Sequence, residues 1–190
     1  LRRHVPWNGH PEGVGDVPHG SFITGPLEIL AGDLAAAERE LTTTCETLEQ
    51  MGERSWYCSL AAGLAETIYL QGRYDEAYGW TVRAELTAGV GDLEAQADFR
   101  AVRAKILGRR GEFAEAERLA REAVEIGRPS EELDHEGDAY FDLAEVLRLA
   151  GRTAEAADAL REAIHLWTLK VNVVSVSKAR ATLATLTSEV

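Results

Sequence analysis

The sequence predicts an all-α superhelix (a solenoid) of helical hairpins, and two observations support this fold class. A short pattern recurs four times in the 190-residue chain: a glycine, a larger side chain two residues on, and an alanine five residues after the glycine in every copy. Apolar residues recur at helical spacing on both sides of each glycine, and no segment shows a convincing strand pattern. The copies begin at Gly32, Gly72, Gly111 and Gly151, which are 40, 39 and 40 residues apart. A fixed period of this length indicates a repeat architecture.

Each repeated glycine is expected to join the two helices of one hairpin. Glycine readily adopts the left-handed backbone that ends many helices. The alanine that follows is expected to be small because two helix backbones cross closely there. We therefore predict about four 40-residue hairpins and a terminal helix. The expected helices span residues 21–31, 33–50, 54–71, 74–88, 92–110, 113–127, 131–150, 153–169 and 173–188.

The last stretch of the chain carries the one hint of strand. Val, Ile and Thr are frequent between Val171 and Thr187, but Ala179, Leu183 and Leu186 keep a helical spacing. We therefore predict a terminal helix here.

The first residues differ in composition from the repeats. Residues 1–20 are rich in Pro, Gly and His, so we expect a flexible segment there and a helical repeat domain over residues 21–190. Without an initiator Met or a signal peptide, the chain is interpreted as a piece of a longer protein. A loose metal site is the alternative to a plain linker in this segment, formed by His4, His10, His19, Glu12 and Asp16.

Charge and cysteine content exclude several classes of partner. Lys and Arg number 20 and Asp and Glu number 32, which gives a net charge of −12. Such a surface repels phosphate backbones and anionic lipids, so direct nucleic-acid or membrane binding is not expected. Nothing in the sequence suggests secretion, and a cytoplasmic location is expected. Cys45 and Cys58 are expected to be buried apolar residues, with a redox pair across the turn near Gly52 as the alternative.

The residues around the repeated glycines resemble the tetratricopeptide repeat. The second copy has large, small and turn residues where that family has them, at Leu64, Ala65, Ile68, Gly72, Tyr74, Ala77 and Ala84. The fourth copy matches through Tyr140, Leu143, Ala144, Leu147, Ala156, Leu160 and Ala163. The departures are Pro26, which interrupts the first leading helix, and Arg103, which stands where the family has a large apolar residue.

The length of the repeat units resembles that of one particular type of tetratricopeptide repeat. They run to 40 residues instead of 34, as in long-helix repeats of bacterial signalling ATPases and transcription regulators. Residues 30–54, 102–123 and 142–163 are similar to the C-terminal repeat regions of bacterial adenylate-cyclase-like and ATPase-linked regulators. The resemblance implies a protein- or peptide-binding regulatory module of a larger signalling protein, with any cyclase or ATPase machinery outside this chain. The alternative is a small-ligand sensor with an enclosed pocket, which Gly63, Gly108 and Gly137 on inner helices would open.

The sequence offers no catalytic constellation. It has no glycine-rich phosphate loop followed by Lys, and no Ser, His and Asp residues are tied into a nucleophile–base pair. His135 to Ala139 begin like a zinc-protease helix, but Ala139 stands where the second His must be. We therefore expect no enzyme activity, no cofactor and no metal site.

The inner groove is the expected binding surface, because the first helix of each hairpin lines the concave face of such a superhelix. One interpretation is that Lys105, Arg109 and Arg148 grip an acidic protein or peptide while Tyr69 and Phe141 anchor its apolar side chains. The other is that these basic residues only balance Glu66, Asp142 or Glu145, with Glu66, Lys105 and Glu145 neutralising one another as a structural ladder that Arg103 joins. Self-association through the ends of the array is a further mode of contact. The candidate site residues are Glu66, Tyr69, Lys105, Arg109, Phe141, Asp142, Glu145 and Arg148.

Overall fold

The structure is a computed structural model and describes residues 27–128 and 133–188. A short helical segment at residues 27–31 precedes the helices that make up the fold. They are α2 (Leu34–Met51), α3 (Ser55–Leu70), α4 (Tyr74–Thr87), α5 (Leu93–Arg109), α6 (Phe113–Gly127), α7 (Leu133–Leu149), α8 (Thr153–Leu169) and α9 (Val173–Ser188). The predicted flexible segment 1–20, with its histidines, lies outside the described residues.

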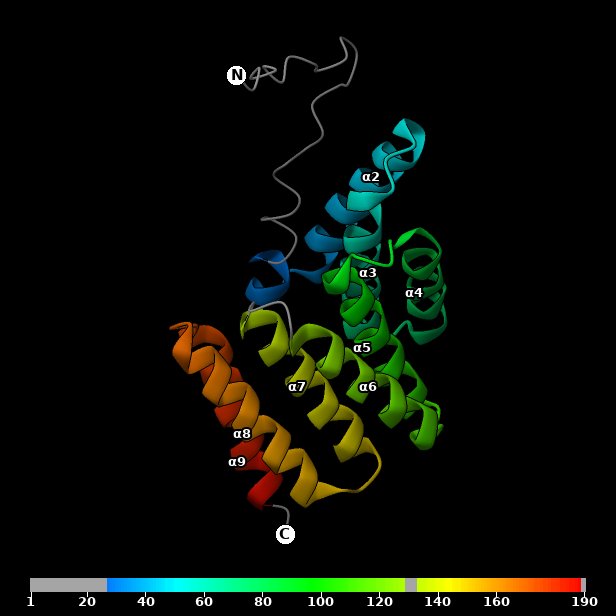
Figure 1. Cartoon of the computed structure of the whole chain (residues 1–190). Helices are drawn as coiled ribbons and strands as arrows, with labels where there is room; N and C mark the ends of the chain where they lie inside the picture. Colours follow the sequence, from blue (N-terminus) through cyan, green and yellow to red (C-terminus); the bar gives the residue numbers. More distant parts are fainter. Residues whose placement is uncertain (1–26, 129–132, 189–190) are drawn as a thin grey trace, which may run out of the picture.

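The helices are arranged as a row of hairpins in two layers (Figure 1). Each helix packs against the next one in the chain, and in addition α5 packs against both α3 and α7. Those three helices therefore form a continuous inner layer, while α4, α6 and α8 follow them as the second helices of their hairpins. The described residues contain no strand, which confirms the all-α hairpin superhelix with a terminal helix.

The repeated glycines and alanines have the roles that the pattern predicts. The glycines that begin the four copies adopt positive φ angles of 81°, 82°, 81° and 75° in chain order. The alanine five residues after each of them is fully buried, at 0% exposure in all four copies. Helix ends and helix crossings therefore follow the 40-residue period of the sequence.

The hydrophobic core consists of two clusters that meet at α5. Phe99, Val102 and Ile106 of α5 belong to the cluster formed with α2, α3 and α4. Ala104 and Leu107 belong to the cluster that continues through α6, α7, α8 and α9. Because α5 contributes to both clusters, it is buried on most of its faces and holds the two halves of the array together.

The last stretch is helical, as predicted, since α9 begins at Val173. The turn before it has an unusual backbone, because Val171 adopts a φ of 61°. The amide of Asn172 donates to the carbonyl of Trp167 at 2.9 Å, and that of Val171 donates to Thr168 at 3.2 Å. This is the Schellman ending in which the left-handed position is usually a glycine.

The two cysteines are free thiols. Cys45 and Cys58 are both buried, and their burial raises the pKa of the first thiol to about 12 and of the second to about 11. The structure thus agrees with their interpretation as buried apolar residues. Among the described residues, no helix combines the length and the apolar character required to cross a bilayer.

Candidate partner-binding groove

A groove of about 590 Å³ runs along the inner layer of helices. Its floor is formed by α3, α5 and α7, and α9 contributes its far wall. Ile29 and Leu30 of the short first helix also line it. Its volume is in the range of sites that hold a peptide side-chain cluster or a small ligand.

A buried lysine joins the three floor helices at the centre of the groove. Lys105 of α5 is only 2% exposed, and its ammonium group donates to Glu66 of α3 and to Asp142 of α7, both at 2.7 Å. Burial alone would lower the pKa of Lys105, but the charges of Asp142 and Glu66 outweigh it and raise the pKa above its ordinary value. The ammonium group is therefore charged, and both its ion-pair partners are protein carboxylates.

A second cluster lies one helical turn further along the same helices. The Tyr69 hydroxyl of α3 donates to Glu145 of α7 at 2.7 Å, and Arg109 of α5 donates to that hydroxyl at 3.0 Å and to Glu145 at 2.7 Å. Burial disfavours the charged form of Glu145, but Lys105, Tyr69 and Arg109 together hold its pKa below the ordinary value. Each cluster thus takes one side chain from each floor helix.

The opposite end of the groove is acidic. Asp98 of α5 and Asp138 of α7 line it, and neither has a hydrogen-bond or ion-pair partner among the described residues. Burial, followed by the charges of Glu94 and Asp142, raises the pKa of Asp98 to about 8. Desolvation and neighbouring carboxylates raise the pKa of Asp138 to about 7, although this side chain lies at the exposed surface of the groove. Both carboxylates therefore lie among like charges.

The structure places six of the eight predicted site residues in the groove. They are Glu66, Lys105, Phe141, Asp142, Glu145 and Arg148. Tyr69 is 4% exposed, and its hydroxyl donates to Glu145, so it lies beneath the groove surface and its role as an apolar anchor stays a prediction. Arg109 lies in a neighbouring depression with Tyr74 and Arg110.

The expected trio of basic contacts needs correction as well. Lys105 is buried between two carboxylates and is not available to a partner, and Arg109 is paired with Glu145. Arg148 is exposed in the groove and forms no ion pair with any described residue, so it is the member of the trio that a partner can reach.

The ladder interpretation holds for Lys105 and Glu66, which pair at 2.7 Å, but the second carboxylate bonded to Lys105 is Asp142 and not Glu145. Lys105 bonds Asp142 at 2.7 Å, one turn before the expected Glu145, which bonds Tyr69 and Arg109 instead. Arg103 does not join the ladder. It faces α4, where it donates to the Thr81 carbonyl at 3.0 Å and pairs with Glu85 at 2.8 Å.

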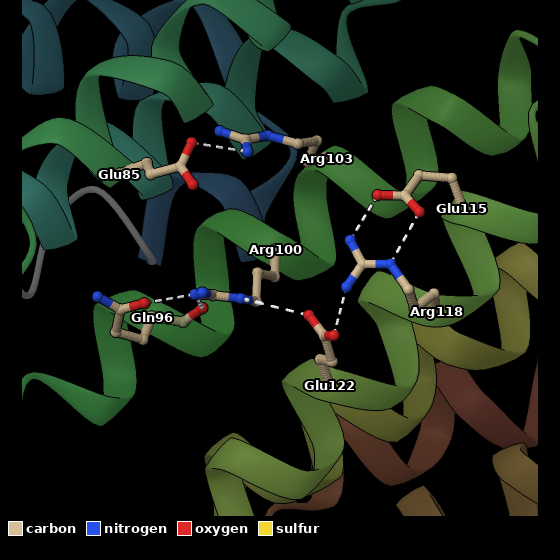
Figure 2. Close-up of polar contacts among 7 residues, drawn as sticks. All are labelled: Glu85, Gln96, Arg100, Arg103, Glu115, Arg118 and Glu122. Atoms are coloured by element: carbon tan, nitrogen blue, oxygen red, sulfur yellow. Dashed lines mark hydrogen bonds and ion pairs between the residues drawn. The ribbon is translucent and has the colours of Figure 1, made fainter. Parts of the chain in front are cut away.

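Figure 2 shows this separate network away from the groove. Arg103 points from α5 to Glu85 of α4, while Arg100 reaches Glu122 of α6 at 3.8 Å. Arg118 then links Glu122 to Glu115 within α6. The charge at position 103, unusual for the repeat, thus ties neighbouring helices together, and these contacts are separate from the groove residues.

Two of the three inner-helix glycines do not open a pocket. A Cβ at Gly137 would lie 2.6 Å from Nε1 of Trp167, and one at Gly108 would lie 3.1 Å from Cδ1 of Leu149. These glycines make room for large side chains of the protein itself. Gly63, by contrast, lines the groove.

Sequence reasoning missed the residues that α9 and the first helix bring to the groove. The ammonium of Lys178 on α9 lies 4.8 Å from the centre of the Phe141 ring, which in turn lies 5.7 Å from the Trp167 ring. Ile29 and Leu30 come from the short helical segment at residues 27–31. The repeat register pointed to α3, α5 and α7 alone. The helical spacing of the apolar residues in α9 was the signal that could have indicated a further helix beside the groove.

Comparison with known proteins supports the fold assignment. Residues 96–168 match the family model described as tetratricopeptide repeat. No curated protein matches the chain.

Solved structures with a similar fold include two of a putative kinesin light chain with nearly identical TPR-like repeats from Podosopora anserina. One of them, a structure of a substituted variant, has 14% identity and a TM-score of 0.55, and covers 90% of this chain and 91% of that one. The second has 13% identity and a TM-score of 0.53, with 90% and 94% covered. BtubC (BKLC) from P. vanneervenii has 14% identity and a TM-score of 0.53, with 89% and 79% covered. At such identities the likeness concerns the fold alone.

Proposed function

We propose that this chain, which carries tetratricopeptide repeats over residues 96–168, binds a peptide segment of another protein in the groove of α3, α5 and α7. Repeats of this family generally mediate protein–protein interaction and scaffolding. The observation that carries the proposal is the groove itself, which is continuous across three hairpins and lined by both apolar and charged side chains. The described residues offer no nucleophile–base pair there, and we infer a binding module, not an enzyme.

The charged residues of the groove limit the kind of peptide segment that can bind there. The buried clusters around Lys105 and Glu145 are internally paired and stabilise the groove floor. The residues at the two ends of the groove are therefore the ones that can contact a partner. At one end a basic group would stabilise the charged forms of Asp98 and Asp138, whose pKa values are raised by burial and by neighbouring carboxylates. At the other end the exposed Arg148 favours an acidic or carboxylate group. We therefore propose a partner segment with charges of both signs, of which the expected acidic contact is one half.

The test uses peptides selected from a displayed random library on the immobilised full chain. Fluorescence anisotropy then gives the Kd of each selected peptide for the parent, for Arg148→Glu and for Asp138→Lys, in buffer with EDTA. We expect each groove variant to bind at least about tenfold more weakly, because one exposed charge contact becomes repulsive. Both positions are exposed, so the melting temperatures should stay close to that of the parent.

The control is Arg161→Glu on α8, an exposed residue outside the groove whose one ion pair is with Asp158 of the same helix. It should bind the peptides as the parent does. Peptides that bind both groove variants as tightly as the parent would place the binding surface elsewhere and end this proposal.

The wider context is also a proposal. The similarity of three stretches to bacterial signalling regulators supports a regulatory module of a larger cytoplasmic protein. Self-association through the C-terminal end is supported by exposed apolar side chains in the turn before α9 and in its first turn, among them Leu169, Val171 and Val173. Sedimentation of the parent and of Leu169→Ser with Val173→Ser tests this, and equal masses at all concentrations would contradict it.

A further inference from the structure

Three potential metal ligands from two helices converge at the acidic end of the groove. Glu94 and Asp98 lie four residues apart on α5 and so project from the same face of that helix. His135 comes from the first turn of α7, which packs against α5. One ligand atom of each residue lies within 4.8 Å of the other two, and Nε2 of His135 is 3.4 Å from a carboxylate oxygen of Glu94.

Asp98, a partly buried carboxylate, has no cation bonded to it among the described residues. Among the described residues it has no hydrogen-bond or ion-pair partner, and the charges acting on it come from other carboxylates, with Glu94 and Asp142 the foremost. The nearby buried cation, Lys105, is already bonded to Glu66 and Asp142. A carboxylate in this setting is stabilised either by a proton or by a metal ion.

The types of ligand select the class of ion. One imidazole nitrogen and two carboxylate oxygens suit Zn²⁺ and similar transition metals, whereas Mg²⁺ and Ca²⁺ prefer oxygen ligands alone. Bonds of about 2.0–2.2 Å to one tetrahedral ion place ligand atoms roughly 3.3–3.6 Å apart, so a pair near the 4.8 Å limit must approach by about 1 Å or more. Glu94 can supply that movement, because its side chain is 55% exposed.

We propose that Glu94, Asp98 and His135 form a binding site for a divalent transition-metal ion of the Zn²⁺ class. Three protein ligands leave a coordination position open to water or to a group of a bound molecule. This site shares Asp98 with the acidic end of the peptide groove. The two proposals can still be tested separately, because the peptide measurements use Arg148 and Asp138 in buffer with EDTA. The competing explanation is an ordinary ion pair between Glu94 and protonated His135.

The test is a titration of the EDTA-treated full chain with Zn²⁺, followed by calorimetry and by thermal melts. We expect uptake of one ion per chain at this site and a rise in melting temperature, since an ion that binds the folded state alone stabilises it. Asp98→Asn and His135→Gln should each weaken this uptake at least about tenfold and remove the rise. Asp98→Asn also removes an unpaired carboxylate, so its metal-free form should melt no lower than the parent, and loss of binding there is not loss of folding.

Two controls separate this site from other histidines. His165→Gln changes an exposed histidine of α8, and a triple variant of His4, His10 and His19 to Gln removes those of the N-terminal segment. Both should keep the Zn²⁺ response. The proposal is overturned if the parent takes up no Zn²⁺, if the response persists in Asp98→Asn and His135→Gln, or if the triple variant alone loses it. Equal affinity for Mg²⁺ would overturn the role of His135 and with it the proposal.

Discussion

At the scale of single residues, Lys105 shows how a buried charge depends on its partners. It is held between Glu66 and Asp142, and removal of its ammonium group leaves two carboxylates facing each other in a poorly solvated place. We expect Lys105→Met to lower the free energy of unfolding by about 3–5 kcal/mol, as for other broken buried ion pairs. Urea unfolding measures this change, and the control is Lys178→Met, which changes an exposed lysine of α9 that forms no ion pair with any described residue.

If Lys105→Met is as stable as its parent, the well-packed methionine compensates for the lost pairs, and the lysine is then retained for a reason other than stability. Peptide binding by that variant would show whether the reason is the shape of the groove.

Val171 is a second residue at which local chemistry and fold conflict. Val171 holds a left-handed φ of 61°, whereas the equivalent left-handed positions in the turns of the four repeats are occupied by glycines. Its β-branched side chain is 77% exposed. Val171→Gly should therefore raise the free energy of unfolding by about 1 kcal/mol, because it removes backbone strain and little packing. Thermal melts test the sign.

A matched control lies two residues away. Val173 is also exposed, at 69%, but is the first residue of α9, so Val173→Gly should not stabilise the chain. Equal effects of the two substitutions would show that the strain at Val171 is not the cause.

At the scale of elements, the small residues at helix crossings set how closely the hairpins pack. Ala116 of α6 and Ala156 of α8 are fully buried at equivalent places in their repeats. Replacing either with Leu should lower the free energy of unfolding by about 1–3 kcal/mol through overpacking. Ala114→Leu, an exposed position in the first turn of α6, should change it by less than about 0.5 kcal/mol.

The helices are also the scale at which sequence was most informative. The glycine and alanine pattern predicted the helices to within a few residues, because helix ends and crossings depend on local backbone requirements that one residue type satisfies. The sequence could not decide which of Asp142 and Glu145 pairs with Lys105, because the choice depends on how far α7 is shifted along α5. The approach of His135 to Glu94 and Asp98 could not be predicted for the same reason, because the residue spacing within one helix does not show which residues of a neighbouring helix lie beside it.

At the scale of the whole molecule, the clusters on the groove floor couple stability to pH. The pKa of Glu145 in the folded chain lies below its ordinary value of 4.5. Glu145 therefore contributes stability that is present above pH 4.5 and is lost as the pH falls through the folded pKa. Glu145→Gln should lower the free energy of unfolding by about 1–2 kcal/mol at pH 7, and the difference from the parent should vanish in acid.

Urea unfolding across this pH range makes the comparison, with the exposed Glu162→Gln of α8 as the control. A difference between Glu145→Gln and the parent that stayed constant down to the lowest pH would mean that the shape of the side chain, and not its charge, matters at this position.

Arrays of this kind are usually regarded as open-ended, with units that can be added or deleted one at a time. The floor clusters make this chain different, because α3, α5 and α7 each supply one member of both. Deleting the hairpin of α7 and α8 would leave Lys105 with one carboxylate and Arg109 without Glu145. A hairpin can therefore be added to or removed from the middle of this array only if the charged residues of its neighbours change with it, so the three hairpins that share these clusters form one interdependent unit.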